Sequence, residues 1–114
     1  MSTEPDAAVR LVVVTAPDAG TAEAMVQALV QERLAACGNI LPGLTSIFRW
    51  QGEVEREQEA LVLLKTTDDV VPRLLGRVPE LHPYDVPEVL VLPIEAGFGP
   101  YLDWVSETTR SQTE

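Results

Sequence analysis

The sequence predicts one α+β domain whose elements follow the order β-α-β-β-α-β, with a short terminal helix after them. Three observations predict this order. They are short β-branched apolar runs, amphipathic segments of helical period between them, and a tight turn signal between two long strand-like segments. The 114 residues are enough for one buried core. We expect flexible ends at 1–8 and 110–114 around a domain at 9–109.

The first strand and helix follow from the apolar pattern. Residues 10–15 form a short β-branched run, typical of a buried strand. Asp18 is the expected N-cap of the next helix, and Gly38 and Asn39 are expected to end that helix after Cys37. The apolar face of this helix consists of Ala22, Met25, Val26, Leu29 and Val30.

Two long strands, 39–50 and 53–66, are expected next. Gln51-Gly52 between them is a two-residue hairpin signal. Pro42-Gly43 interrupts the first strand, and a proline there requires an edge or a bulge. We therefore expect a bent strand whose outer part leaves the sheet.

A second helix, a last strand at 89–94 and the terminal helix complete the domain. Asp68 is the expected cap of the second helix, with Pro72 in its first turn. Pro100 marks the start of the terminal helix. The apolar face of the second helix consists of Val71, Leu74, Leu75 and Val78. This element order is that of the ferredoxin-like split βαβ fold, an antiparallel sheet with helices on one face.

Composition excludes several classes of function. The net charge of −10, with 18 acidic against 8 basic residues, argues against nucleic-acid binding, which needs clustered Lys and Arg. A single cysteine excludes an intrachain disulfide and a Cys-based zinc cage, and it fits a reducing compartment. No targeting segment or membrane span is visible, so we expect a cytoplasmic protein without a membrane partner.

The hairpin predicts an oligomer. Two large aromatic residues, Phe48 and Trp50, lie near its tip, where a small monomer does not usually expose them together. We expect the hairpin to reach a neighbouring subunit, and the alternative is a hairpin that curls back on its own sheet. Glu53, Glu55, Glu57 and Glu59 alternate along the second arm and share one side of it. They form either a solvated face or a face with inter-subunit partners such as Arg49 or Arg56.

Several motifs together resemble the CutA divalent-cation-tolerance family. They are ERLAACGNILPGLTSIFRWQGEVE at 32–55, LKT at 64–66, HPYDVPE at 82–88, LPIEAG at 92–97 and YLDW at 101–104. The resemblance covers about residues 10–107. It implies a PII-like homotrimer whose long hairpins bridge neighbours, a role in divalent-metal tolerance, copper especially, and no established reaction. The chain departs from the family pattern at Gly38, where an aliphatic residue is frequent, and at Val14, where some members carry a thiol.

His82, Glu88 and Cys37 are the candidate metal ligands. Copper prefers imidazole and thiolate, whereas hard cations prefer carboxylate oxygen. One His and one Cys per chain cannot close a site, so copies within a trimer would share it. The alternatives are a buried core role for Cys37 and a hydrogen-bonding role for His82. A Cys–His nucleophile assisted by Asp85 lacks a local motif, so we expect neither an enzyme nor a required cofactor.

A ligand-binding cleft between subunits is the second candidate site. Lys65 ends a buried strand and needs a carboxylate partner, for which Glu59 and Glu88 are the candidates. The alternative is an inter-subunit salt bridge that only holds the trimer together. The resemblance suggests that the cleft is lined by Lys65, His82, Tyr84 and Glu88, with Trp50 nearby.

Three functions remain open from the sequence. The first is a CutA-like tolerance protein with weak binding of copper or another divalent cation. The alternative is a PII-like signalling adaptor that binds a small anion or a protein partner at the subunit clefts, although no Gly-rich phosphate loop is present. The third is a structural trimer stabilised by ion pairs.

Overall fold

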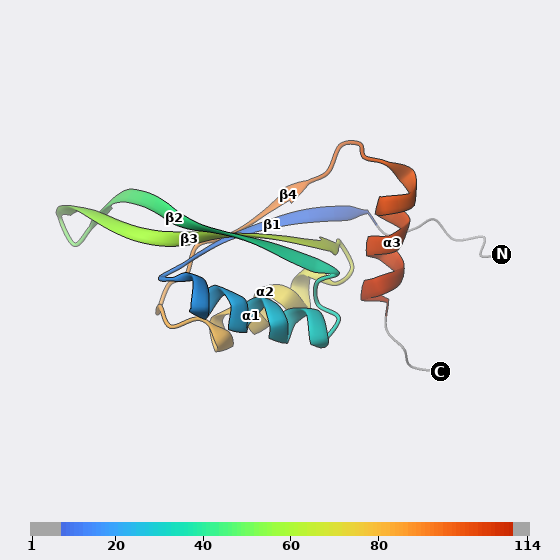
Figure 1. Cartoon of the computed structure of the whole chain (residues 1–114), viewed down its shortest axis with the longest axis horizontal. Helices are drawn as coiled ribbons and strands as arrows, with labels where there is room; N and C mark the ends of the chain where they lie inside the picture. Colours follow the sequence, from blue (N-terminus) through green and yellow to red (C-terminus); the bar gives the residue numbers. More distant parts are fainter. Residues whose placement is uncertain (1–7, 111–114) are drawn as a thin grey trace.

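The computed structural model describes residues 8–110, and its elements follow the predicted order. Apart from Ala8 and Arg110, the predicted flexible ends lie outside the described residues. The elements, shown in Figure 1, are β1 (Val9–Ala16), α1 (Ala19–Gln31), β2 (Cys37–Trp50), β3 (Glu53–Thr67), α2 (Val71–Leu81), β4 (Val89–Pro93) and α3 (Gly99–Thr109).

The four strands form one antiparallel sheet in the order β2-β3-β1-β4. β1 and β3 are the inner strands and pair from Val9–Thr67 to Ala16–Ala60. This inner position accounts for the dense apolar runs that the sequence shows in both strands. The order and direction of the strands, together with two helices on one face, confirm the predicted ferredoxin-like α+β fold.

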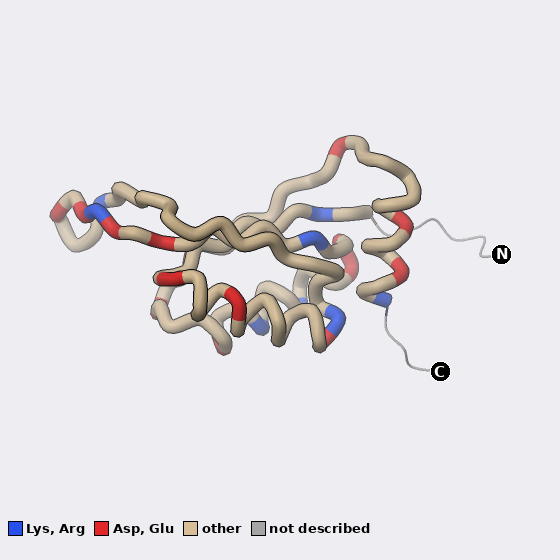
Figure 2. The backbone as a smooth tube through the Cα atoms, in the orientation of Figure 1, with Lys and Arg blue, Asp and Glu red and all other residues tan. Residues whose placement is uncertain are grey.

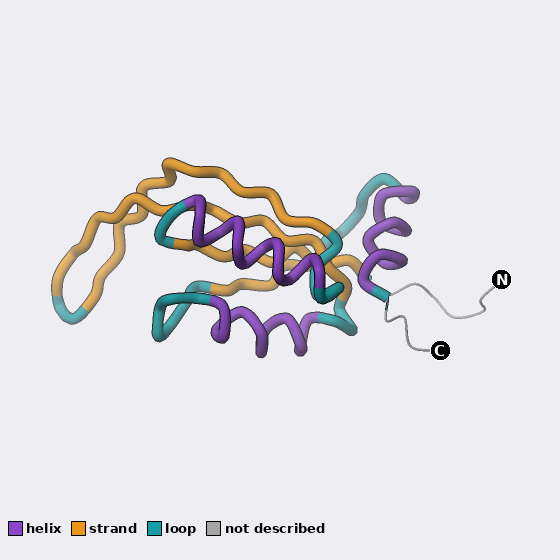
Figure 3. The backbone as a smooth tube through the Cα atoms, turned by 60° about the horizontal axis from the view of Figure 1, so that its bottom comes forward, coloured by secondary structure: helices purple, strands orange, loops and turns teal. Residues whose placement is uncertain are grey.

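Helices α1 and α2 lie side by side across one face of the sheet (Figure 3). Four of the five residues predicted for the apolar face of α1 are buried there, with Leu29 fully enclosed, and Val30 is partly buried. Burial of each large aliphatic side chain contributes about 1.5–3 kcal/mol. The strand residues beneath the helices include Val12, Val14, Ala60, Val62 and Leu64.

The predicted helix starts are partly confirmed. Asp18 caps α1, since its Oδ1 accepts a hydrogen bond from the Thr21 N–H at 2.7 Å, and this bond lowers the pKa of Asp18. The cap predicted at Asp68 is wrong, because α2 begins two residues later than that cap requires and Val70 occupies its N-cap without a side-chain bond. Pro72 lies in the first turn of α2, as predicted.

The predicted end of α1 is also wrong. The helix ends at Gln31, well before Gly38, because Arg33 takes a left-handed conformation with φ of 61°. A non-glycine residue in that conformation carries little sequence signal. The Ala36 N–H then donates to the Lys65 carbonyl at 2.8 Å, which draws the chain into the sheet. Cys37 is therefore the first residue of β2 and not the last of a helix.

β2 and β3 continue beyond the sheet as a two-stranded ribbon that projects past the helices (Figure 1). Gln51 and Gly52 turn the chain at its tip with φ of 52° and 84°, which confirms the predicted hairpin. The molecule is 55 Å long and 28 Å wide as a result of this projection. Residues 44–59 are called the outer ribbon below.

A β-bulge marks the point where the ribbon leaves the sheet. Pairing steps from Leu41–Leu61 to Leu44–Glu59, so Pro42-Gly43 oppose the single residue Ala60. Gly43 has φ of 80°, a conformation that glycine accepts without a Cβ clash. The bend predicted from the proline is confirmed.

α3 covers one end of the other sheet face. Its Val105 packs against Val9 and Ala36, and Leu102 adds to this small cluster. Arg33 also fixes the helix, since its Nη1 donates to the Thr108 carbonyl at 2.9 Å. No helix within residues 8–110 has the length and apolar character needed to cross a bilayer.

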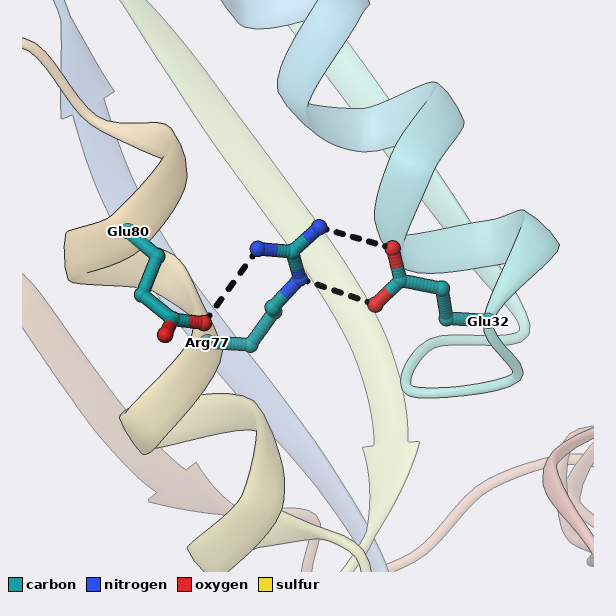
Figure 4. Close-up of polar contacts among 3 residues, drawn as sticks. All are labelled: Glu32, Arg77 and Glu80. Atoms are coloured by element: carbon teal, nitrogen blue, oxygen red, sulfur yellow. Dashed lines mark hydrogen bonds and ion pairs between the residues drawn. The ribbon is translucent and has the colours of Figure 1, made fainter.

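An ion-pair group joins α2 to the residue that follows α1 (Figure 4). Arg77 donates to both carboxylate oxygens of Glu32, at 2.9 and 3.0 Å, and to Glu80 at 3.2 Å. The bond from Arg77 lowers the pKa of Glu32, and the same bond raises the pKa of Arg77. Both helices are thereby linked at the surface as well as through the core.

The sheet face opposite α1 and α2 is apolar and largely uncovered by this chain beyond α3. Its outer strand β4 exposes Leu90 and Leu92 to 56% and 42%. Opposing residues on paired strands share a face, so the register identifies the rest of this surface. We call the set the open face: Leu11, Val13, Leu61, Leu63, Leu90 and Leu92.

Candidate functional site

His82 anchors the loop that joins α2 to β4. Its ring is buried, and Nε2 lies 2.7 Å from the carbonyl oxygen of Thr15 in β1. Nδ1 accepts the Tyr84 N–H at 3.2 Å. A carbonyl can only accept and an N–H can only donate, so the neutral ring with hydrogen on Nε2 satisfies both bonds. Both nitrogens of the chain's single imidazole therefore hold the loop in place.

Tyr84 and Glu59 form the clearest polar pair near this loop. The Tyr84 hydroxyl donates to Oε2 of Glu59 at 2.9 Å, and Glu59 is only 8% exposed. Burial raises the pKa of Tyr84 to about 12, with further contributions from the bond to Glu59 and from nearby carboxylates. The phenol thus stays protonated and donates to a carboxylate that sits at the base of the outer ribbon.

Lys65 lies farther along the same side of β3. Its ammonium donates to the side-chain oxygen of Asn39 and, at 3.4 Å, to the Leu63 carbonyl. The prediction that Lys65 pairs with a carboxylate is therefore wrong within this subunit. Glu59 is six residues away along the strand, about 20 Å, whereas Asn39 lies on the neighbouring strand opposite Leu63.

Cys37 is half-buried beneath α3 and not enclosed in the helix core. Its Sγ lies 3.4 Å from the Tyr101 hydroxyl, and Tyr101 stacks near Trp104 with ring centroids 5.7 Å apart. Burial, followed by the contact with Cys37, raises the pKa of Tyr101 to about 12. The sequence signal for this contact is the pair of aromatic residues in the YLDW motif at 101–104.

The structure does not bring Cys37 and His82 together. Cys37 pairs with Lys65, and the Thr15 carbonyl that holds His82 belongs to a residue paired with Leu61. Four residues along β3 separate these positions, about 13 Å. A Cys–His nucleophile within one subunit has no geometric support.

The three predicted metal ligands also lie apart. Glu88 is exposed in the loop before β4, Cys37 is under α3, and His82 uses both ring nitrogens. Among residues 8–110, no group of three or more His, Cys, Asp or Glu side chains is placed to hold a metal ion. The donors of one subunit do not fit a closed divalent-cation site.

Of the side chains predicted for the ligand cleft, Tyr84 directly meets Glu59, which was expected there as a candidate partner of Lys65. Lys65 lies toward α3 on the same side of β3. Trp50 pairs with Glu53 near the tip and is 54% exposed. Glu53 is six residues from Glu59, about 20 Å. One subunit therefore presents these side chains in a row along β3 and not around one cavity.

A separate hollow lies between β1, α3 and the segment that joins β4 to α3. It has a volume of about 290 Å³ and contains none of the predicted site residues. Two carboxylates and several small or aliphatic side chains line it: Ala8, Val9, Ile94, Glu95, Ala96, Leu102 and Asp103.

Comparison with known proteins gives one consistent result. A family model described as CutA1 divalent ion tolerance protein matches residues 10–108. The divalent-cation tolerance protein CutA of Thermus thermophilus is 56% identical over 99 residues, covering 87% of this chain and 96% of that protein. Human protein CutA is 44% identical over 101 residues, and the match spans 89% of this chain but only 56% of the human protein.

The fold agrees with this result. The solved structure of the Thermus thermophilus divalent cation tolerance protein superposes with a TM-score of 0.87 at 54% identity, covering 90% of this chain and 99% of that one. A CutA1 crystal structure from Oryza sativa gives a TM-score of 0.90 at 36% identity, covering 94% and 98%. The similarity therefore extends over nearly all of the described residues.

Proposed function

The chain belongs to the CutA1 divalent ion tolerance protein family, and from this premise we propose that it serves divalent-cation tolerance as a homotrimeric binding protein. The family description names tolerance of divalent ions and no reaction. We propose that the protein acts by binding and not by catalysis. We propose the cytoplasm as its compartment, since Cys37 is a free thiol.

The open face is the observation that supports the proposed homotrimer. A sheet with helices on one side needs a cover for its second apolar side. Here that side is largely aliphatic, and Leu90 and Leu92 remain 56% and 42% exposed. Contiguous apolar surface of this kind marks an interaction site on a folded protein. Contact between open faces of three copies would remove it from water.

Assembly would also complete a ligand cleft. Tyr84 and Glu59 provide a preformed polar pair at the base of the outer ribbon. A ribbon from a second copy would supply an aromatic residue, Trp50, that the pair lacks within its own subunit. We propose that a small ligand or a protein partner binds in this inter-subunit cleft, with Lys65 toward its far end.

We propose that any divalent cation, copper included, is bound weakly and through oxygen ligands. Glu88 is the most accessible of the predicted donors, and Glu59 offers its carboxylate beside the cleft. Binding through the His82 imidazole would break a hydrogen bond that positions the loop. Carboxylate oxygens favour hard cations over copper, so weak selectivity is expected.

Native mass spectrometry of the chain, with and without added Cu(II), tests the proposal. The expected mass is three times the 12.5 kDa of the chain. Equilibrium dialysis with Cu(II) then compares the native chain with Glu88→Gln and His82→Gln. Weaker binding is expected for Glu88→Gln and unchanged binding for His82→Gln. A monomer would contradict the assembly, and a loss confined to His82→Gln would contradict the oxygen-ligand proposal.

A further inference from the structure

The carboxylate of Glu59 is buried without a cation beside it. Glu59 is 8% exposed, and the Tyr84 hydroxyl donates to its Oε2 at 2.9 Å. Among residues 8–110, every fully buried polar side-chain atom has a hydrogen-bond partner. Oε1 of Glu59 receives no such bond from these residues, so it is open to solvent. A buried carboxylate without a cation is costly, and a positive partner from outside the subunit would offset that cost.

The basic side chains of the subunit do not pair with Glu59. The ion pairs found among residues 8–110 belong to Arg77. The Lys65 ammonium bonds to neutral groups, an amide oxygen and a backbone carbonyl. The two ends of the chain outside the described residues contain no Lys, Arg or His. The positive charge that Glu59 lacks must therefore be supplied by another molecule.

Two further carboxylates add negative charge around Tyr84. Glu57 and Asp18 both contribute to the raised pKa of its phenol, so both lie within electrostatic reach of it. Glu57 is two residues from Glu59 on the same side of β3, about 7 Å away. Figure 2 shows acidic positions on the outer ribbon and at the start of α1. This concentration of negative charge attracts cations and repels anionic ligands.

The arrangement suits an organic cation better than a metal ion. A metal ion needs several oxygens about 2.0–2.6 Å from itself, and among residues 8–110 no group of three or more acidic, His or Cys side chains is placed to hold one. An ammonium group instead needs hydrogen-bond acceptors at ordinary distances, and it also binds over an aromatic ring. Tyr84 is 38% exposed, and its ring lies against His82 with centroids 4.8 Å apart. A charged carboxylate thus lies beside a partly accessible aromatic ring.

We propose that Glu59 and Tyr84 form a binding site for an organic ammonium ligand, and that a short diamine also reaches Glu57. One ammonium group donates to Oε1 of Glu59 beside the Tyr84 ring, and the second donates to the Glu57 carboxylate. This inference rests on the proposed binding function and names the class of small ligand that the cleft takes. Its three residues belong to one subunit, so the site does not need a second copy to supply its charge.

Isothermal titration calorimetry of the full chain tests this site. Phosphate buffer at constant ionic strength avoids a competing buffer amine. The probe is 1,4-diaminobutane, and the matched ligands are 1-aminobutane, with one charge, and butane-1,4-diol, with none. Glu59→Gln removes the buried charge with little change of shape, and Glu57→Gln removes the second charge. Glu107→Gln is the control, since it makes the same change of net charge at an exposed position of α3.

We expect one diamine to bind per chain and the diol not to bind. Glu59→Gln should weaken binding of the diamine at least about tenfold, because a charge-assisted hydrogen bond is lost. Glu57→Gln should weaken binding of the diamine and leave binding of the monoamine unchanged. Glu107→Gln should bind both amines as the native chain does.

Equal losses in Glu59→Gln and Glu107→Gln would mean a general attraction of amines to an acidic protein, and they would overturn the inference. A native chain that takes up no diamine would overturn it too, as expected if a basic side chain of a second copy already occupies Glu59. If Glu59→Gln does not fold, nuclear magnetic resonance of the native chain replaces it. Saturable shifts at Glu59 and Tyr84 would then support the site, and shifts found only elsewhere would contradict it.

The oligomeric state is measured separately, by native mass spectrometry of the same samples. A trimer without Glu59-dependent amine binding contradicts this inference and leaves the proposed homotrimer standing. A monomer that binds the diamine through Glu59 does the reverse.

Discussion

Gly38 lies where the core has no room for a side chain. A Cβ at this position would lie 2.7 Å from Cγ1 of Val26 and 2.8 Å from Cδ2 of Leu64. Val26 belongs to α1, and Leu64 is the β3 residue paired with Gly38. Both neighbours are core residues, at 8% and 0% exposure. The two neighbours therefore fill the space that a side chain at this position would need.

Two opposing effects decide the outcome of Gly38→Ala. Replacing glycine with alanine stabilises the folded protein by about 0.4–1 kcal/mol, because the unfolded chain loses conformational freedom. Overpacking a filled core costs about 1–3 kcal/mol. The added Cβ would lie much closer than the normal separation to two enclosed side chains. The cost of overpacking is therefore expected in the upper part of that range. We expect a net loss of about 1–2 kcal/mol and a fall in melting temperature of roughly 5–10 °C.

Thermal unfolding at one fixed protein concentration measures this effect, since self-association stabilises the folded chain. Gly76→Ala in α2 is the control of opposite sign. Gly76 is exposed, and a Cβ there would meet no atom within 4 Å, so about 0.5–1 kcal/mol of added stability is expected. In a Val26→Ala background, Gly38→Ala should cost less. A Gly38→Ala protein that melts at or above the native temperature would refute the packing argument.

Three further outcomes follow from the polar contacts. Tyr84 and Tyr101 are the chain's two tyrosines and both have a pKa raised to about 12, so tyrosinate absorbance should stay flat through pH 10. A raised pKa favours the protonated folded form, so its stabilisation is intact below about pH 10 and is lost as pH rises toward 12. A double-mutant cycle of Tyr84→Phe and Glu59→Gln should give a coupling of about 1 kcal/mol, reduced by the 38% exposure of Tyr84; additive effects would count against the bond. The lowered pKa of Glu32 adds stability above its unfolded pKa that disappears on acidification, so Arg77→Met should flatten the fall in melting temperature between about pH 7 and pH 3.

The fold was predictable because each strand and helix carried its own local signal. The hairpin turn and the bulge were readable from Gln51-Gly52 and Pro42-Gly43, since each conformation favours those residue types. The end of α1 was not readable. Arg33 adopts a left-handed conformation that its residue type does not predict. Pairing of the following residues with β3 imposes this conformation.

The sequence analysis named the residues of the Tyr84–Glu59 pair but did not predict the hydrogen-bond partners of the candidate site residues. The bond between Tyr84 and Glu59 joins residues 25 positions apart, and the sequence named both without pairing them. Lys65 was expected to find a carboxylate, but strand register placed the Asn39 amide beside it. Register depends on long-range pairing, so side chains that meet across strands cannot be assigned from local pattern alone.

The bulge at Pro42-Gly43 shifts the register of β2 against β3 by one residue. Before it, odd-numbered residues of β2 share the open face with odd-numbered residues of β3; after it, even-numbered residues do. If pairing continued from Leu41–Leu61 without the bulge, the outer β2 arm would slip by one residue against β3, and Arg49 would lie opposite Glu53, among the glutamates, instead of opposite Val54. One extra residue in β2 thus decides which side chains share each side of the outer ribbon.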